Sequence, residues 1–235
     1  MFPLISRTKS LSATLASIDN FLKTNEFAHI VSLNPENLVE AVNADDFKST
    51  LERAEIIIAD GIGILHAAHI LNFAVGDKIT GIDLMSELIL KYPEKRIVFV
   101  GALSDNAQKT SEYFAKKTGT SGTHWKVFPD VDKNDPGLVD KITAVKPDLL
   151  FVAFGSPSQE MWIENHRTQL HGVVCMGVGQ AFDVYGGMVA RAPRLVQALG
   201  LEWLYRLITQ PWRWRRQLRL LNFIYLVIRY RIFSR

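Results

Sequence analysis

The sequence has a single cysteine among its 235 residues, and its last part has almost no acidic side chains. Because Cys175, which stands inside an apolar run, has no second cysteine to pair with, a disulfide framework is excluded. A reducing cytoplasm is compatible with this composition. Residues 191–235 contain ten of the fourteen arginines, no lysine and one carboxylate, Glu202, for a net charge of +9. Residues 1–190 have a net charge of −6. This difference predicts an anionic, phosphate-rich partner for the C-terminal segment.

The sequence also lacks a hydrophobic run that could span a bilayer, which takes about 20 residues. Its most apolar stretch, Leu220–Ile228, is interrupted by Asn222 and closed by Arg229. With arginines before it and aromatic residues around it, this stretch resembles an interfacial membrane segment. A buried core helix or a subunit contact is the alternative. Because no apolar stretch follows Arg7 and Lys9, we expect no signal peptide.

Motifs that would assign a cofactor are incomplete. The segment Gly177-Val-Gly-Gln-Ala-Phe-Asp183 lacks the third glycine of the dinucleotide fingerprint, which disfavours an NAD-dependent oxidoreductase. No Asp-x-Asp pair stands at the end of a predicted strand, and no third ligand completes a zinc site with His66 and His69. We therefore expect neither a metal nor another cofactor.

Short apolar runs alternate with helical patterns along the chain. The predicted strands are His29–Leu33, Glu55–Ala59, Arg96–Gly101, His124–Phe128, Leu149–Phe154 and Val173–Gly177. The predicted helices are Pro35–Asn43, Asp45–Arg53, Gly61–Leu71, Gly81–Lys91, Ser104–Lys117, Pro136–Val145 and Pro157–Leu170, with Ser104 and Asp105 as caps of the fifth. This alternation predicts an α/β fold with a mostly parallel, Rossmann-like sheet and flanking helices. Because charge and lysine usage change near Arg191, we expect an α/β domain over residues 1–190 and a basic, aromatic, helical appendage over 191–235.

Polar or glycine-bearing turns follow five of the predicted strands. They are Ser32–Pro35, Asp60–Gly63, Gly101–Ala102, Gly155–Gln159 and Gly177–Gln180. Ligands of parallel sheets bind at the carboxyl ends of the strands, where backbone amides and helix N-termini favour phosphate. Four glycine turns on one edge therefore predict a nucleotide-type ligand.

Two side chains in these turns have more than one interpretation. Asp60 ends an apolar strand directly before Gly-x-Gly, a position that fits a general base, a sugar ligand or the N-cap of the following helix. Gln159 follows a strand–Gly–Ser–Pro turn. Its amide could bind a sugar, or it could be a polar first-turn residue that stabilises its own helix.

Taken in order, these segments resemble the WecG/TagA/CpsF family of bacterial glycosyltransferases. The residues that carry the resemblance are Asn34–Glu36, Ala59–Gly63, Thr80–Leu84, Gly155–Trp162, Gly177–Asp183, Arg191–Pro193, Leu199–Leu207 and Pro211–Arg213. The glycine turns are individually common. The Leu-Glu-Trp-x-x-Arg-Leu segment followed by Pro-x-Arg makes the combination highly specific.

The resemblance implies inverting transfer of a sugar from a UDP-sugar to a polyprenyl-diphosphate-linked saccharide in surface or exopolysaccharide biosynthesis. The sugar would be N-acetylmannosamine, its uronic acid or glucose. The family's general base falls on Asp60, and its C-terminal arginines, which complete the active site, fall on Arg206, Arg213 and Arg216. Its sugar-pocket residues fall on Ser32, Asn34 and Gln159. To these we add Lys78, Gly101, Gly155, Gly177, Gly179 and Asp183 as candidate substrate-binding residues.

Three positions depart from the family pattern, and they leave the donor sugar open. Lys78 replaces a usual arginine, Ser158 a usual lysine and Gln210 a usual glutamate. The expected location is the inner face of the cytoplasmic membrane, as a peripheral protein and possible homo-oligomer. The alternative function is a nucleotide-binding regulator whose basic tail docks on nucleic acid or membrane. Because the tail lacks lysine and is strongly apolar, we expect no nucleic-acid partner.

Overall fold

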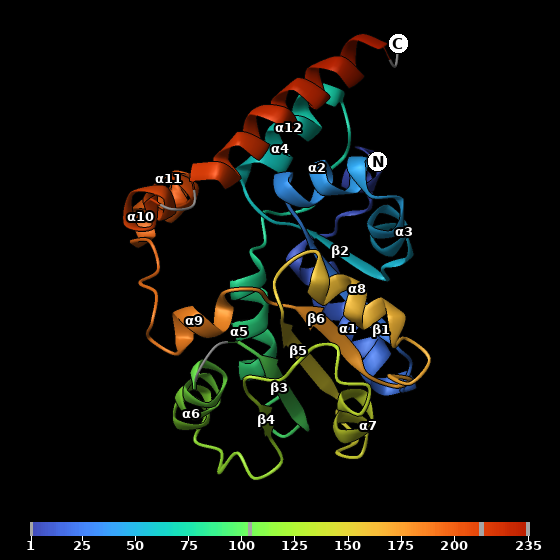
Figure 1. Ribbon diagram of the computed structural model, residues 1–235, viewed down its shortest axis with the longest axis vertical. Helices are drawn as coiled ribbons and strands as arrows, with labels where there is room; N and C mark the ends of the chain where they lie inside the picture. Colours follow the sequence, from blue (N-terminus) through green and yellow to red (C-terminus); the bar gives the residue numbers. More distant parts are fainter. Residues whose placement is uncertain (1, 103–104, 212–213, 234–235) are drawn as a thin grey trace.

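A computed structural model describes residues 2–102, 105–211 and 214–233 of the chain, without the side chains of residues 215–217. Its centre is a six-stranded, all-parallel sheet with the strand order β2-β1-β6-β5-β3-β4 (Figure 1). The strands are β1 (Ala28–Leu33), β2 (Ile56–Ala59), β3 (Ile97–Gly101), β4 (Lys126–Phe128), β5 (Leu149–Ala153) and β6 (Val174–Gly177). All six predicted strands are confirmed: β1 begins one residue earlier than predicted, and the other five are one or two residues shorter at one end.

Helices cover both faces of this sheet (Figure 1). They are η1 (Phe2–Arg7), α1 (Leu11–Thr24), α2 (Pro35–Asn43), α3 (Asp45–Arg53), α4 (Ile62–Leu71), α5 (Gly81–Lys91), α6 (Asn106–Thr118), α7 (Leu138–Thr143), α8 (Ser158–Asn165), α9 (Ala181–Tyr185), α10 (Arg194–Ala198), α11 (Glu202–Thr209) and α12 (Trp214–Phe233). The fold class predicted from the alternation of elements is therefore confirmed.

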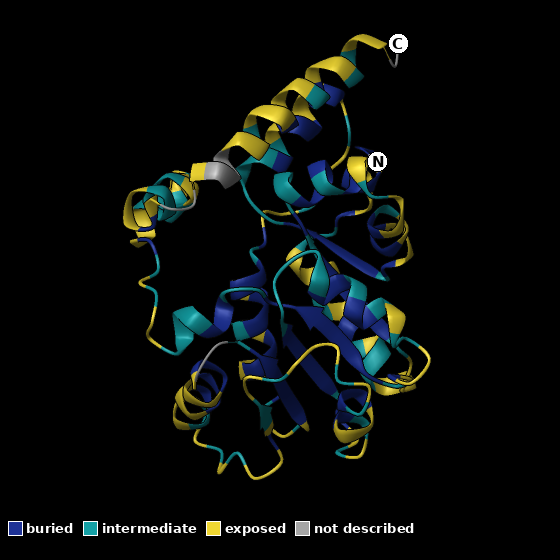
Figure 2. Cartoon of the chain, viewed as in Figure 1, coloured by how far each residue is buried: buried dark blue, intermediate teal, exposed yellow. Residues whose placement is uncertain are grey.

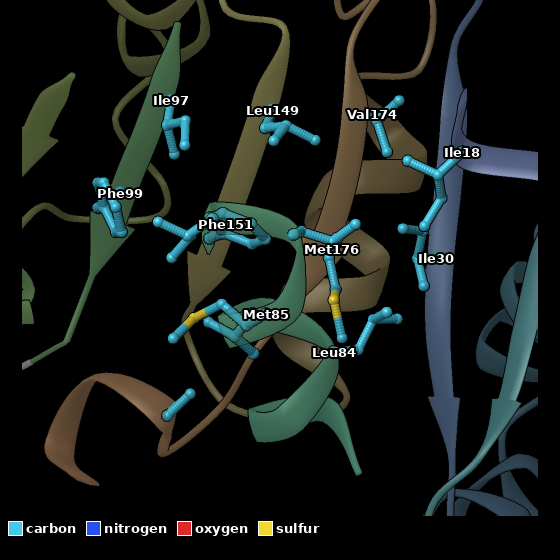
Figure 3. Packing of buried hydrophobic residues seen from close by; sticks show 14 of the residues in the cluster. Ile18, Ile30, Leu84, Met85, Ile97, Phe99, Leu149, Phe151, Val174 and Met176 are labelled. Atoms are coloured by element: carbon cyan, nitrogen blue, oxygen red, sulfur yellow. The ribbon is translucent and has the colours of Figure 1, made fainter. Parts of the chain in front are cut away.

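Alternate residues of the buried strands point to opposite faces and build separate apolar clusters. On one face α1, α5, α6 and α9 pack against the strands, and Figure 3 shows Phe99, Phe151 and Met176 in this layer. On the other face α2, α3, α4 and α12 cover β1 and β2, whereas α7 and α8 cover β3, β5 and β6. Both faces of the sheet are thus buried beneath helices, and polar groups collect at its carboxyl edge.

Side-chain caps fix where several helices begin. The Asn34 side chain accepts the backbone N–H of Asn37 at 2.9 Å, with Pro35 in the first turn of α2. Ser10 caps α1 in the same way, and this helix is absent from the predicted set. The expected cap of α6 is wrong for Asp105, which stands at the N-cap but makes no side-chain cap bond. Ser104 lies outside the described residues.

The C-terminal segment crosses over the carboxyl edge of the sheet and ends in α12, which packs on α2 and α4 (Figure 1). Phe223 and Val227 of α12 are buried, and the Tyr230 ring lies 5.0 Å from that of Phe2. Much of the remaining surface of α12 is exposed (Figure 2). Within the described ranges, no helix combines the length and the apolar character needed to cross a membrane.

Candidate active site

A cavity of about 970 Å³ lies at the carboxyl ends of β1, β2, β5 and β6, beneath the C-terminal segment. It brings together ten of the sequence-predicted site residues: Ser32, Asn34, Asp60, Lys78, Gly155, Gln159, Gly177, Gly179, Asp183 and Arg206. Gly101 is not in its lining, although the next residue, Ala102, is. Arg213 lies outside the described residues, and so does the side chain of Arg216.

Asp60 follows β2 and is held at the first turn of α5. Its Oδ2 accepts the backbone N–H of Gly81 at 3.2 Å. The cap interpretation is wrong for the following helix, because Gly61, with φ +92°, is the N-cap of α4 and no side chain caps it. Burial raises the pKa of Asp60 to about 6, while the Gly81 N–H and the charge of Arg206 act in the opposite direction. A carboxylate with this pKa accepts protons well near neutral pH.

Ser32 lies near the end of β1 and Asn34 directly follows this strand, and both line the cavity. The Ser32 Oγ is buried and has no hydrogen-bond partner within the described part of the chain. A Cβ added at Gly81 would come within 2.7 Å of this oxygen, so a larger residue there would displace the Ser32 hydroxyl group. Asn34 uses its Oδ1 to cap α2. The orphaned hydroxyl group lines the cavity and is available to a polar ligand.

Gln159 connects two of the glycine turns. Its Oε1 accepts the backbone N–H of Gly179 at 3.1 Å, and its Nε2 donates to Glu160 at 2.8 Å. A Cβ at Gly177 would lie 2.6 Å from this Nε2, so close packing excludes a larger residue there. Burial raises the pKa of Glu160, which lines the cavity and whose Oε2, like the Ser32 Oγ, has no hydrogen-bond partner in the described structure. Gln159 therefore fixes the turns after β5 and β6, and the sugar-binding interpretation stays a prediction.

Arg206 brings a positive charge to the cavity from α11. Its guanidinium donates to Glu202 at 3.0 Å and to Gln180 at 3.5 Å. The charge of Arg206 lowers the pKa of Asp60, which is a direct electrostatic link between the appendage and the sheet edge. Gln180 and Glu202 were not among the predicted site residues. The i,i+4 spacing of Glu202 and Arg206 was the available sequence signal.

Two further contacts attach the C-terminal segment to the loop before α5 and to the first turn of that helix. The Arg191 guanidinium forms an ion pair with Asp83 at 2.7 Å, and the Lys78 Nζ donates to the carbonyl oxygen of Gln197 at 3.0 Å. Burial raises the pKa of Asp83, but the hydrogen bonds from Arg191 and Thr80 and the charges of Arg191 and Lys78 together lower it below its usual value. Sequence reasoning quoted Asp83 and Arg191 as motif residues and gave them no role. Lys78 combines a position in the cavity wall with this attachment.

The remaining candidates have structural partners. Asp183 accepts a hydrogen bond from the buried Asn106 at 2.8 Å, a neighbour that the sequence did not indicate. Burial raises the pKa of the Cys175 thiol in β6 well above its usual value, so this thiol is not activated. In the chain as described, no group of three His, Cys, Asp or Glu side chains is placed to hold a metal ion.

The cavity at the carboxyl edge of this α/β fold is lined by an ionisable carboxylate, Asp60, and by a guanidinium, Arg206, whose charge acts on it. The chain matches the Glycosyl transferase WecG/TagA/CpsF family over residues 4–235 and belongs to it. The family resemblance and the glycosyltransferase activity predicted from the motifs are thereby confirmed. The alternative, a nucleotide-binding regulator, finds no support in this match.

Characterised relatives share much of the chain. The chain is similar to an N-acetylglucosaminyldiphosphoundecaprenol N-acetyl-beta-D-mannosaminyltransferase of Bacillus spizizenii, with 35% identity over 213 residues, 89% of this chain and 82% of the relative. Enzymes of the same name from Bacillus subtilis and Staphylococcus aureus (strain NCTC 8325 / PS 47) are 34% and 31% identical. They cover 86% and 80% of this chain, and 79% and 73% of their own lengths.

Proposed function

We propose that this protein transfers N-acetylmannosamine from a UDP-sugar to an N-acetylglucosamine carried on undecaprenyl diphosphate, with inversion at the anomeric carbon. The names of its relatives support the sugar and the acceptor. The observation that carries the proposal is the geometry around Asp60. A carboxylate with a pKa of about 6 lines a large cavity, and the charge of Arg206 acts on it.

The chemistry is a single displacement. An acceptor hydroxyl oxygen attacks the anomeric carbon, its proton passes to the Asp60 carboxylate, and the bond to the β-phosphate oxygen of UDP breaks with the electron pair on UDP. The departing diphosphate gains negative charge. We assign its stabilisation to Arg206, which lines the same cavity and whose charge acts on Asp60. Arg213 and Arg216 are proposed as further cations for the same diphosphate, in place of a metal ion.

The other cavity residues supply the donor site. We assign the free Ser32 hydroxyl and the Asn34 side chain to the sugar. The turns at Gly155, Gly177 and Gly179 lie near the start of α8 and α9, and we place the diphosphate beside these helix N-termini. Asp183 and Lys78 complete the polar lining, Asp183 beside Asn106 and Lys78 beside Gln197.

The appendage is also proposed to hold the enzyme on the inner face of the cytoplasmic membrane. One stripe of α12, at a spacing of three or four residues, exposes large apolar side chains: Trp214, Leu218, Leu221, Tyr225, Ile228 and Ile232. Arginines on the same helix suit anionic headgroups, each contributing on the order of 1 kcal/mol. Association of two copies through this stripe is the competing outcome, and sedimentation with and without anionic vesicles separates the two.

A transfer assay tests the proposal. Purified protein is given UDP-N-acetylmannosamine, UDP-N-acetylmannosaminuronic acid or UDP-glucose with a short-chain N-acetylglucosamine-diphosphate lipid. We expect a β-linked disaccharide and free UDP with the first donor, and activity that survives excess EDTA. Transfer of another sugar would change the donor assignment. Full loss of activity on chelation, with recovery on added magnesium, would show that a metal ion and not the arginines stabilises the diphosphate. Transfer of none of the three sugars to this acceptor would overturn the proposal.

A further inference from the structure

The cavity does not end at the polar residues around Asp60. It continues between two helices into a region with mainly apolar walls. We call this region the α4–α12 groove and define it by Ile62, His66 and Ile70 of α4 and Leu220, Ile224 and Ile228 of α12. Each set recurs at intervals of four residues, so the three side chains of one set follow one face of their helix. Polar site and apolar groove are one continuous space.

The groove leads away from the base. Ile62 stands two residues after Asp60, and Ile70 is near the end of α4, about 12 Å farther at 1.5 Å per residue. Its outer part is open, because Ile70 is 45% exposed and Ile224 is 47% exposed. An open row of apolar side chains beside a catalytic cavity favours an extended apolar ligand.

The α12 helix has a second open apolar surface beside the groove. The stripe proposed to contact the membrane includes Leu221 and Tyr225, and Ile228 belongs to both the stripe and the groove. A chain that leaves the cavity along the groove would therefore reach the membrane-facing side of the same helix. An ion pair between Arg219 and Glu40, at 3.4 Å, links α12 to α2 beside this path.

We infer that the α4–α12 groove binds the first isoprene units of the acceptor lipid. The inference rests on the proposed function, in which a saccharide diphosphate occupies the polar end, so that the polyprenyl tail begins where the groove begins. The groove gives the enzyme a site for the tail itself, separate from membrane attachment. Acceptor binding should depend on tail length even when no membrane is present, because each buried methylene adds favourable free energy.

The test uses acceptors with one head group, N-acetylglucosamine diphosphate, and tails of one to four isoprene units, in buffer without detergent or vesicles and below the concentration at which they aggregate. For the wild-type protein we expect KM to fall about tenfold or more as the tail grows to fill the groove and then to level off. A KM that does not change with tail length would overturn the inference.

Matched variants locate the effect. Ile70→Ser and Ile224→Ser should flatten the dependence of KM on tail length, and both sites are open enough that folding is retained. Val42→Ser is the control, because Val42 is 46% exposed on α2 and outside the cavity lining. Leu221→Ser should weaken binding to anionic vesicles and keep the wild-type dependence on tail length.

The outcomes separate the two proposals. Retention of the wild-type dependence by both isoleucine variants would overturn the groove assignment while transfer itself still supports the proposed function. An equal flattening by Val42→Ser would also overturn it, since the effect would not be specific to the groove. Failure of the wild-type protein to transfer sugar to an acceptor of any tail length would count first against the proposed function.

Discussion

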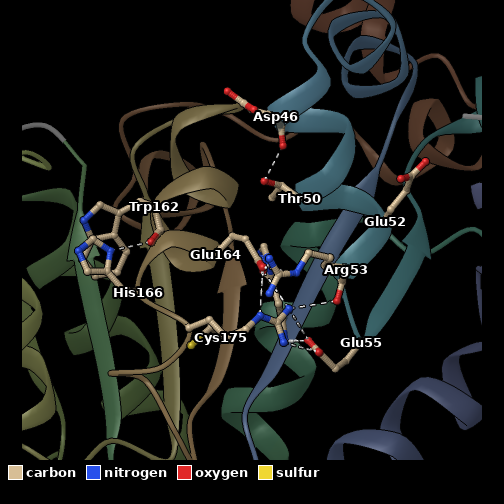
Figure 4. A network of polar contacts seen from close by, with 12 residues as sticks. Asp46, Thr50, Glu52, Arg53, Glu55, Trp162, Glu164, His166 and Cys175 are labelled. Atoms are coloured by element: carbon tan, nitrogen blue, oxygen red, sulfur yellow. Dashed lines mark hydrogen bonds and ion pairs between the residues drawn. The ribbon is translucent and has the colours of Figure 1, made fainter.

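Two carboxylates of this protein, Asp60 and Glu164, differ in what surrounds them. The Glu164 side chain is only 7% exposed, yet it accepts hydrogen bonds from Arg167 and pairs with Arg53 at 2.9 Å (Figure 4). Burial alone would raise its pKa, but the neighbouring His29 and the two guanidinium groups lower the pKa to about 2. Asp60 is partly exposed, has one backbone hydrogen bond, and has a pKa of about 6.

The comparison shows that the pairing of a carboxylate, more than its exposed area, decides whether it stays ionised or accepts protons near neutral pH. Glu164 is fixed as an anion that joins α8 to α3 and, through the Arg167–Glu55 pair at 2.6 Å, to the start of β2. Arg206 acts on Asp60 through its charge, while its guanidinium group donates a hydrogen bond to Glu202. An incompletely paired carboxylate in a cavity is typical of a functional site, and a fully paired one of structure.

The largest expected effect comes from Asp60→Asn. The asparagine side chain keeps an oxygen that accepts a hydrogen bond from the Gly81 N–H, but it cannot take the proton of the attacking substrate hydroxyl group. We expect kcat to fall about a hundredfold to ten-thousandfold, with UDP binding nearly unchanged, measured by transfer assay and calorimetry. Glu164→Gln is the paired control and should keep wild-type turnover at a temperature where it is folded. An Asp60→Asn protein with the parent rate would rule out this base.

Arg206→Gln should have the next largest effect. Loss of one charge at a developing anion costs on the order of a hundredfold to a thousandfold in kcat. Since the Arg206 charge lowers the pKa of Asp60, the acidic limb of kcat/KM, expected near pH 6 in the parent, should move upward. Arg206→Lys should restore the position of the limb and only part of the rate, because lysine lacks the planar fork. If the acidic limb of kcat/KM stays at the same pH in Arg206→Gln, the charge of Arg206 does not act on Asp60.

Glu164→Gln should lower stability rather than activity. The pKa of Glu164 is lowered from its unfolded value of 4.5 to about 2, so its stabilisation is present above pH 4.5 and is lost as the pH falls through about 2. We expect the variant to lose about 3 kcal/mol of unfolding free energy at pH 7, with the difference shrinking between pH 4.5 and 2. Urea unfolding at a series of pH values measures this. A difference that is independent of pH would show that ionisation is not its cause.

Asp60→Asn should change stability with the opposite sign. The folded pKa of about 6 lies above the unfolded 3.8, so the ionised Asp60 destabilises the fold, and wild-type stability declines as pH rises through this interval. The variant should therefore gain on the parent between pH 4 and 6, by at most about 3 kcal/mol. If the difference in unfolding free energy between variant and parent is the same at pH 4 and at pH 8, the raised pKa is contradicted. Together with Glu164→Gln, this experiment tests the comparison directly.

Local sequence signals were sufficient where one helix or one strand decides the outcome. The predicted bounds of α2 and α5 are the observed ones, because Asn34 and Thr80 cap them and apolar residues recur at helical spacing. The glycine turns were predicted to meet at one sheet edge, and Asp60, Gly155, Gly177 and Gly179 do line one cavity. Parallel strands bring their carboxyl ends to the same edge, so order along the chain is enough for this inference.

Contacts between distant segments were beyond such signals. Lys78 meets a carbonyl oxygen 119 residues away, and Arg191 meets Asp83 across 108 residues. Neither pairing follows from spacing, because many carbonyl oxygens and carboxylates along the chain could have accepted a hydrogen bond from each side chain. The pKa of Asp60 has the same origin, since burial and the approach of Arg206 arise only after the C-terminal segment folds over the sheet edge.

The sequence by itself determined the parallel α/β sheet, the polar edge, the family and the basic, aromatic character of residues 191–235, because periodicity, turn chemistry and charge composition are local properties of the chain. Only the tertiary structure decided that Gln159 joins two turns. It also decided that Glu164 is a paired, structural anion, whereas the carboxyl group of Asp60 has a raised pKa. It also decided that α4 and α12 extend the cavity with apolar walls. These properties depend on which groups lose water together and which find a partner when they do, and that is settled by packing between segments far apart in the chain.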